Sequence, residues 1–174
     1  MSPNVLLDAK TQTRAGKYLT FALGHEEFGL GILKVREIIG IMEITAIPRA
    51  PDYVRGVVNL RGQVISVVDL RAKFGMEHAA QTEQTCIIVV EIQRHERKLS
   101  MGIIVDRVSE VLNIPGENIE DPPEFSGGGG ADFILGMGKV GTSVKILLDI
   151  DKVLTSAEIN AVTEIINEST SKGD

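Results

Sequence analysis

Apolar side chains alternate with polar or small ones along most of this chain, and a period of two is typical of β-strands. In residues 17–23 the side chains of Leu19, Phe21 and Leu23 would share one face of a strand. The same pattern predicts strands at residues 27–30, 32–39, 41–47, 85–91, 99–105, 108–114, 133–140 and 143–150. Residues 32–39 also fit one helical turn followed by a strand, because periodicity alone does not separate the two.

The clearest turn lies between two β-branched runs within residues 54–75. Arg61 and Gly62 separate these runs, and glycine can supply the positive φ of a tight hairpin turn. Asn59 and Gly62 are expected to shape the turn, since asparagine makes short local hydrogen bonds. Asp69 follows the second run and is expected to cap a short turn.

The chain divides by composition into a tail, one β-rich domain and a terminal helix. Residues 1–16 are polar without a sustained period and are expected to form a flexible tail. Residues 17–154 form the domain, in which the polar stretch 76–84 is interpreted as a linker between two β-rich halves and 116–132 as a long loop. Residues 155–174 predict a C-terminal helix, opened by a capping box, and a short tail.

Two segments of the chain recur in the same order. A shift of 73 residues superposes 28–39 on 101–112, and a shift of 80 superposes 56–74 on 136–154. The identities include Gly29 and Gly102, Val35 and Val108, Glu37 and Glu110, Gly56 and Gly136, Val64 and Val144, and Asp69 and Asp149. Chance similarity between strand-turn-strand units is the alternative. True repeats of this size would each bury little surface alone, which favours two small barrels packed around a common core.

Composition narrows the function classes. Hydrophobic residues make up 43% of the chain, aromatic residues 4%, and tryptophan is absent, so the core is expected to be aliphatic. The formal net charge of -6 and pI near 5.1 argue against a nucleic-acid partner, which favours a basic surface with aromatic stacking platforms. No apolar run approaches the roughly 20 residues that span a bilayer, so we expect a cytoplasmic protein without direct membrane insertion.

No local motif indicates catalysis, a metal site or a cofactor. His25, His78 and His95 lie in polar, turn-like segments, and none has a second ligand at a metal-binding spacing. Cys86 lies in an apolar run and is expected to be a small core residue rather than a reactive thiol. The segment 136–143 lacks the spacing of a phosphate-binding loop. An enzyme with a noncontiguous site is the alternative to a non-catalytic binding protein.

The segments LKVREIIG at 33–40 and RGVVNLRGQVISVVDLRAKFG at 55–75 closely resemble the CheW family of bacterial chemotaxis coupling proteins. The resemblance extends over residues 17–154. It implies two intertwined five-stranded SH3-like β-barrels around a shared aliphatic core. It also implies a non-catalytic scaffold that joins the regulatory domain of the histidine kinase CheA to the cytoplasmic tips of transmembrane chemoreceptors in arrays. A scaffold for another two-component output system is the alternative function.

The same resemblance suggests which residues meet partners. Val35 and Glu37 would form an apolar contact beside a charge that fixes register, with ordinary strand patterning as the alternative. Arg61 resembles a functionally sensitive arginine of the family, and its guanidinium could bind a partner carboxylate or stabilise the local turn. The residues expected to support this site are Asn59, Gly62, Asp69 and Arg71.

Chemoreceptor tips in this family are helical hairpins, so the expected contact is an apolar groove that receives a helix. The candidate groove residues are Ile32, Val35, Ile38, Ile87, Val105 and Val108. Any of them could belong to the core instead, because core and interface residues on strands both alternate with period two.

Overall fold

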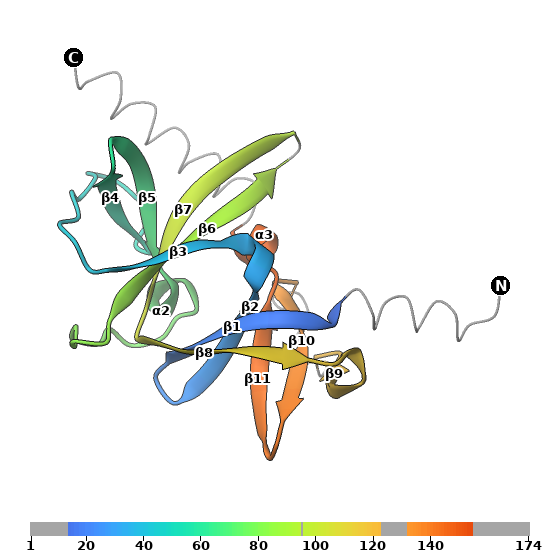
Figure 1. Cartoon of the computed structure of the whole chain (residues 1–174). Helices are drawn as coiled ribbons and strands as arrows, with labels where there is room; N and C mark the ends of the chain where they lie inside the picture. The colour runs from blue at the N-terminus through green and yellow to red at the C-terminus, as the bar shows by residue number, and fades with distance from the viewer. Residues whose placement is uncertain (1–13, 95, 123–131, 155–174) are drawn as a thin grey trace. The chain divides into compact units, whose positions relative to one another are not determined.

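The computed structural model describes residues 14–94, 96–122 and 132–154, which form two β-sheets (Figure 1). The chain divides into two compact units. Unit 1 contains the described residues up to Leu33 and those from Val108 to Val153, and unit 2 contains Lys34 to Arg107 together with Leu154. The prediction of a mostly β fold is confirmed.

Unit 1 holds a six-stranded sheet and unit 2 a five-stranded sheet. The first, in the order β8-β1-β2-β11-β10-β9, comprises β1 (Gly16–Leu23), β2 (Glu26–Gly31), β8 (Arg107–Ile114), β9 (Ile119–Glu120), β10 (Ile134–Val140) and β11 (Ser143–Leu148). The second, in the order β3-β6-β7-β5-β4, comprises β3 (Val35–Gly40), β4 (Val54–Leu60), β5 (Gln63–Asp69), β6 (Cys86–Arg94) and β7 (Arg97–Val105). The short helices are η1 (Ile32–Lys34), α2 (Leu70–Lys73), η2 (Gly116–Asn118) and α3 (Ile150–Val153). Five strands were expected in each sheet, and the two-residue β9 is the sixth in unit 1.

Both sheets follow the same plan, and each combines strands from both sequence repeats. In unit 1 the hairpin β1-β2 has β8 on one side and β11-β10 on the other, and in unit 2 the hairpin β6-β7 has β3 and β5-β4 in those places. The parallel pairs have the same register, with Leu147 opposite Gly29 and Val67 opposite Gly102. These positions are related by the two shifts found in the sequence. The repeats therefore exchange strands, which is the sense in which the two units are intertwined.

The short helices after the two hairpins begin in the same way. Asp69 accepts a hydrogen bond on its carboxylate from the backbone N–H of Arg71 at 3.0 Å. Asp149, 80 residues later, accepts one from the N–H of Asp151 at 3.2 Å. Asp69 is the N-cap of α2, so its predicted capping role is confirmed.

Each unit has an apolar core of its own. Buried side chains of unit 2 cluster at Val58, Ile65, Val67, Ile87 and Val89. Those of unit 1 cluster at Tyr18, Ile114, Ile119 and Leu147. Because a fully buried aliphatic side chain of this size contributes about 1.5–3 kcal/mol, the clusters supply much of the driving force for closing each sheet.

The strand expected at residues 41–47 is wrong. Only Thr45 forms a β-bridge, through two backbone hydrogen bonds with Val57 of 2.8 and 2.9 Å. The apolar residues around it pack against the core of unit 2 at Ile41, Met42 and Ile44. The alternation in this segment therefore reflects packing along β4 without a continuous ladder of hydrogen bonds.

The polar stretch 76–84 does not link two halves of the molecule. It connects α2 to β6 inside unit 2, because strand exchange places parts of both repeats in each unit. The expected loop 116–132 contains η2 and β9 in its described part. The predicted helix at 155–174 lies outside the described residues.

Arg14, which falls in the expected N-terminal tail, is buried and donates a hydrogen bond to Asp121 at 2.7 Å. The earlier residues of that tail lie outside the described ranges. Among the helices that the structure describes, none has the length and apolar character needed to cross a membrane.

Candidate functional site

The tip of the β4-β5 hairpin in unit 2 presents Arg61 in a fixed conformation. Leu60 pairs with Gln63, which leaves Arg61 and Gly62 as the two turn residues with φ values of 50° and 87°. Positive φ at both positions is typical of a type I′ turn. The side-chain oxygen of Asn59 accepts a hydrogen bond from the N–H of Gly62 at 2.8 Å. Asn59 and Gly62 therefore hold the turn that positions the arginine.

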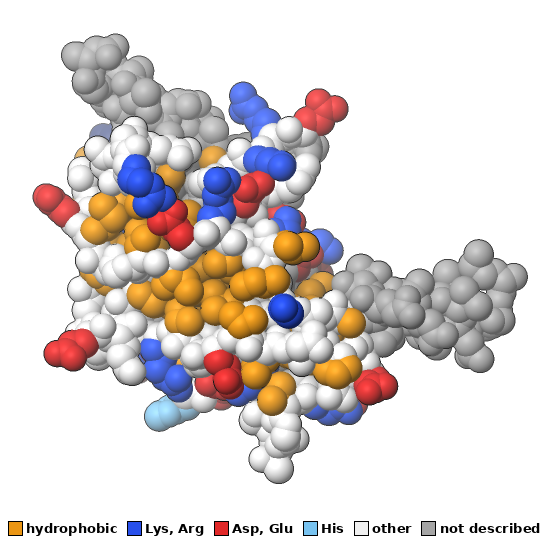
Figure 2. Space-filling view, in the orientation of Figure 1, with side chains coloured by type: hydrophobic (Ala, Val, Ile, Leu, Met, Phe, Trp, Pro, Cys, Tyr) orange, Lys and Arg blue, Asp and Glu red, His pale blue; other side chains and the backbone are white. Residues whose placement is uncertain are grey.

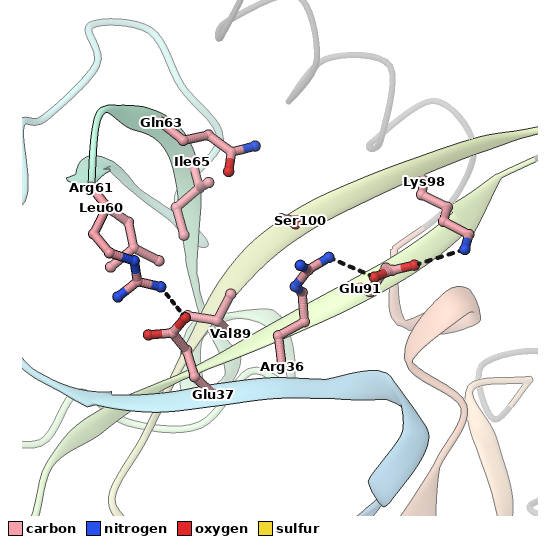
Figure 3. A pocket seen from close by; sticks show the side chains of 10 residues that line it. All are labelled: Arg36, Glu37, Leu60, Arg61, Gln63, Ile65, Val89, Glu91, Lys98 and Ser100. Carbon is pink, nitrogen blue, oxygen red and sulfur yellow. Dashed lines mark hydrogen bonds and ion pairs between the residues drawn. The ribbon is translucent and has the colours of Figure 1, made fainter.

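The guanidinium of Arg61 forms an ion pair with the carboxylate of Glu37 on β3 (Figure 3). The register in which β3 pairs with β6 shifts between Val35 and Glu37. The hydrogen bond from Arg61 holds the pKa of the Glu37 carboxyl below its ordinary value. The Arg61 side chain is 69% exposed, so the pair lies at the surface, where a partner can reach both charges.

A pocket of about 400 Å³ lies beside this ion pair, entirely within unit 2. Its apolar wall is formed by Leu60, Ile65 and Val89 (Figure 3). The charged and polar residues that line it are Arg36, Glu37, Arg61, Gln63, Glu91, Lys98 and Ser100. The surface view in the orientation of Figure 1 shows basic and acidic side chains adjoining hydrophobic ones (Figure 2). Such a mixture suits recognition of a protein surface that carries both apolar and charged groups.

Glu91 is held between two basic residues at the other end of the pocket. Arg36 donates a hydrogen bond to it at 2.7 Å, and the Lys98 ammonium lies 3.5 Å from its other oxygen (Figure 3). Arg36 and Glu37 are neighbours on β3 and engage different partners, Glu91 and Arg61. We call the set Arg36, Glu37, Arg61, Glu91 and Lys98 the charged rim. The rim fixes the orientation of its side chains before any partner binds.

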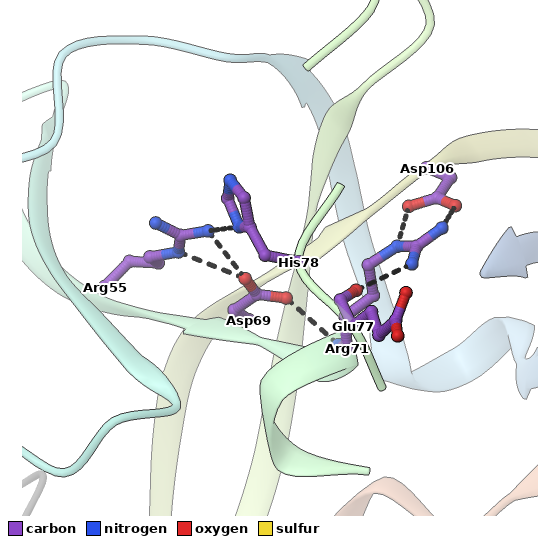
Figure 4. A network of polar contacts seen from close by, with 6 residues as sticks. All are labelled: Arg55, Asp69, Arg71, Glu77, His78 and Asp106. Atoms are coloured by element: carbon purple, nitrogen blue, oxygen red, sulfur yellow. Dashed lines mark hydrogen bonds and ion pairs between the residues drawn. The ribbon is translucent and has the colours of Figure 1, made fainter. Parts of the chain in front are cut away.

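A second polar network surrounds the start of α2 (Figure 4). Arg55 donates two hydrogen bonds, of 3.1 and 2.9 Å, to one carboxylate oxygen of Asp69. The Nδ1 atom of the exposed His78 lies 3.1 Å from the same guanidinium. Since Asp69 is buried, these contacts compensate its charge and tie the end of β5 to residues beyond α2.

Arg71 links α2 to the end of β7. Its guanidinium donates two hydrogen bonds to the carboxylate of Asp106, at 2.8 and 2.5 Å, and one to the carbonyl of Glu77 at 2.9 Å (Figure 4). The hydrogen bonds to Asp106 raise the pKa of the Arg71 guanidinium. Arg71 thus connects α2 to the end of β7 in unit 2, and it is not a member of the charged rim.

The remaining predicted contact residues separate into three groups. Val35 is half-buried and Ile38 is 46% exposed, both on β3 beside Glu37. Ile32 and Val108 are half-buried residues of unit 1. Ile87 and Val105 are fully buried, so their side chains are core residues and are not available to a partner as predicted.

Three residues of the charged rim were missed from the sequence: Arg36, Glu91 and Lys98. The alternation of β3 gives a local signal for Arg36, because this residue shares the exposed strand face with Ile38, opposite Val35. Glu91 and Lys98 become neighbours of β3 only through the pairing of β3 with β6 and of β6 with β7. No local sequence pattern predicts that strand pairing.

The side chains at these sites form ion pairs and hydrogen bonds with one another. Within residues 14–94, 96–122 and 132–154, no three His, Cys, Asp or Glu side chains are grouped so as to hold a metal ion. Cys86, expected in the core, is half-buried at the start of β6.

Comparison with known proteins identifies the family. The family model described as "CheW-like domain" matches residues 17–158. The chain belongs to the CheW family. Among CheW relatives, the "Chemotaxis protein CheW" of Klebsiella aerogenes is 38% identical over 154 residues, which covers 88% of this chain and 90% of the relative. The protein of the same name from Treponema pallidum is 33% identical over 147 residues, covering 84% and 86%.

A solved CheW structure confirms the fold. The scaffolding protein TtCheW from Thermoanaerobacter tengcongensis matches with a TM-score of 0.72 and 33% identity, covering 83% of this chain and 95% of that one. The predicted intertwined CheW architecture, with two β-rich units, is therefore correct.

Proposed function

We propose that this chain is a non-catalytic adaptor of chemotaxis signalling that couples a CheA-type histidine kinase to the cytoplasmic tips of transmembrane chemoreceptors. Membership of the CheW family supports the adaptor role, and the solved relative is described as a scaffolding protein. In this function the chain contributes surfaces that hold other proteins together. It is recruited to membrane-associated arrays through those proteins.

The observation that carries the proposal is the exposed Arg61–Glu37 ion pair beside an apolar pocket wall. An exposed ion pair contributes little to folding stability. Stability alone therefore does not explain why this ion pair forms at a constrained turn. A partner that inserts an apolar side chain beside Leu60 and presents its own charges to the rim would gain both burial and register. We assign Val35, Glu37, Ile38 and Arg61 to this contact surface.

The half-buried residues Ile32 and Val108 are assigned to a second, weaker contact. Two contact surfaces on one small chain allow it to bridge a kinase and a receptor. Each contact can then be modest in affinity, because simultaneous engagement in an array adds their effects.

The test is binding of the purified chain to the CheA-type kinase from the same cell. Arg61→Ala and Glu37→Lys are each expected to weaken binding at least tenfold while leaving the circular dichroism spectrum unchanged. The exchanged pair Glu37→Arg with Arg61→Glu restores the ion pair with reversed polarity. It should remain weak if the partner contacts these charges directly, and recover if the pair serves only to hold the turn.

Lys139→Ala provides the matched control. Lys139 also pairs with a glutamate on an exposed strand surface, Glu120, at 2.8 Å, but it lies in unit 1. Its loss should leave kinase binding unchanged. Wild-type protein that fails to bind either the kinase or a receptor cytoplasmic fragment would overturn the proposal.

A further inference from the structure

The two sheets end in four edge strands, which differ in length and in their contacts. β9 has only two residues. β4 is bridged at Val57 by Thr45, and β3 has six residues and carries Glu37, whose side chain pairs with the hairpin tip. β8 differs, since it has eight residues and, in the described part of the chain, no segment pairs with its outer edge. Proteins normally block such edges, and β8 contains neither proline nor lysine to do so.

The backbone of β8 offers hydrogen-bonding groups to that open edge. The N–H and carbonyl of Glu110 both bond the hydroxyl of Thr20 on β1, at 3.1 and 2.8 Å, so they point into the sheet. Successive residues of a strand direct their backbone groups to opposite sides. The N–H and carbonyl of Val111 therefore point outward. The side chain of Val111 is also 51% exposed, so an added strand would find it accessible.

Glu110 occupies the position in unit 1 that Glu37 occupies in unit 2. Glu37 lies opposite Val89 in the register of β3 and β6, and Glu110 is bonded to Thr20 at the corresponding place on β1. In unit 2 the hairpin tip supplies Arg61 to the glutamate, but the corresponding tip residue of unit 1 is Gly141. Among the described residues, the carboxylate of Glu110 has no ion-pair partner.

We propose that the outer edge of β8 binds an extended segment of a partner protein as an added strand, with Glu110 pairing with an arginine or lysine of that segment. The added strand bonds the outward backbone groups of Val111 and covers its side chain. The counterpart of Glu110 in unit 2, Glu37, binds a guanidinium, which favours a basic residue as the partner of Glu110. This site lies on unit 1 and goes beyond the kinase contact proposed for the charged rim of unit 2.

The probe is an acetylated nine-residue peptide of alternating valine and threonine with a central arginine, added to the ¹⁵N-labelled full chain. Amide shift changes are expected to concentrate at residues 107–114. A peptide with a central glutamate should bind at least fivefold more weakly. Glu110→Arg should reverse this order and prefer the glutamate peptide, a result that a merely structural role of Glu110 would not produce.

Two further variants test the geometry. Val111→Pro removes the outward N–H, which an edge strand tolerates, and should abolish binding without loss of fold. Gly141→Arg supplies an arginine at a position whose φ of 60° is close to the 50° of Arg61, and should compete with the peptide for Glu110. The control is Glu117→Arg, which makes the same charge change at an exposed site of unit 1 and should leave binding unchanged.

Several outcomes would overturn the proposal. These are equal binding of the two peptides, shift changes confined to unit 2, or no change in β8 at millimolar peptide. Self-association of the chain that requires both Arg61 and Glu110 would assign the edge to a second copy instead. If Val111→Pro fails to fold, the reversal of preference in Glu110→Arg still decides the question.

Discussion

In unit 1 the parallel strands β2 and β11 bring Glu27 beside Lys145 as an ion pair whose side chains are largely buried. In unit 2 the corresponding strands β7 and β5 bring Ser100 beside Ile65, and both residues line the pocket. The strand order and register are the same in the two places. The same backbone plan therefore accepts an ion pair in unit 1 and a serine with an isoleucine in unit 2, where both residues line the pocket.

The hairpin tips differ in the same manner. Arg61 binds Glu37 in unit 2, whereas the tip of unit 1 has Gly141 and leaves Glu110 exposed. The framework residues, in contrast, agree: Asp69 and its counterpart cap equivalent helices. Duplication thus preserves the residues that shape the backbone and lets the surface side chains diverge, which gives one chain two different surfaces.

The bulge glycines should give the largest difference between the units. Gly56 has a φ of 145°, and a Cβ added there would lie 2.1 Å from the backbone oxygen of Thr45. At the corresponding Gly136 the nearest atom is a side-chain atom, Cγ2 of Ile119, at 2.6 Å, and the nearest backbone atom, the carbonyl oxygen of Glu120, lies at 3.1 Å. Gly56→Ala is expected to lower the free energy of unfolding by about 4 kcal/mol, and Gly136→Ala by about 1–2 kcal/mol. Urea unfolding of both variants measures this, and equal losses would refute the distinction.

Replacing the Glu27–Lys145 ion pair of unit 1 by the residues found at the same positions of unit 2 should change the free energy of unfolding by an intermediate amount. Lys145→Ile alone removes the ammonium that pairs with the partly buried Glu27 and should cost about 1–2 kcal/mol. Adding Glu27→Ser reproduces the Ile65–Ser100 contact and should restore stability to within about 1 kcal/mol of the wild type. A double-mutant cycle by thermal and urea unfolding provides the measurement. A double variant less stable than either single one would show that the two units are not interchangeable here.

The smallest effect concerns pH and the Arg61–Glu37 pair. Arg61 lowers the pKa of Glu37 from its ordinary value of 4.5, so the pair stabilises the fold above that value, and its contribution is lost as pH falls through the lowered pKa. Arg61→Ala should return the pKa of Glu37 towards 4.5. Its small destabilisation at neutral pH should vanish in acid.

Carboxyl ¹³C NMR titration of Glu37 reads this pKa directly. Lys139→Ala in unit 1 serves as the control and should leave it unmoved. An unchanged Glu37 pKa in Arg61→Ala would mean that the pair does not form in solution.

Local features of the fold could be predicted well from the sequence. Arg61 and Gly62 identified the hairpin turn because positive φ has a clear residue preference, and Asp69 identified a cap because its side chain acts two residues away. The shifts of 73 and 80 residues likewise found positions that prove equivalent in the two sheets. Each of these signals depends on neighbours in sequence or on direct comparison of two segments.

Features that depend on long-range pairing could not be predicted. The sequence repeats do not reveal that β1-β2 associates with β10-β11 rather than with β4-β5, since both choices bury similar apolar faces. Ile87 lies in an apolar run and Ile38 lies beside Ile39, so the sequence marks both as apolar strand positions, yet one is fully buried and the other is exposed. Glu37 and Arg61 were each expected at the site, but their direct pairing depends on the position of a hairpin tip 24 residues away.

Strand exchange between the repeats also bears on synthesis at the ribosome. The hairpin β1-β2 leaves the exit tunnel first, but its sheet is completed only when β8, β10 and β11 have been made. The five-stranded sheet can close once β7 has emerged, well before the end of translation. We therefore expect unit 2 to fold first during translation. Until unit 1 is complete, the N-terminal hairpin exposes apolar surface to which chaperones can bind.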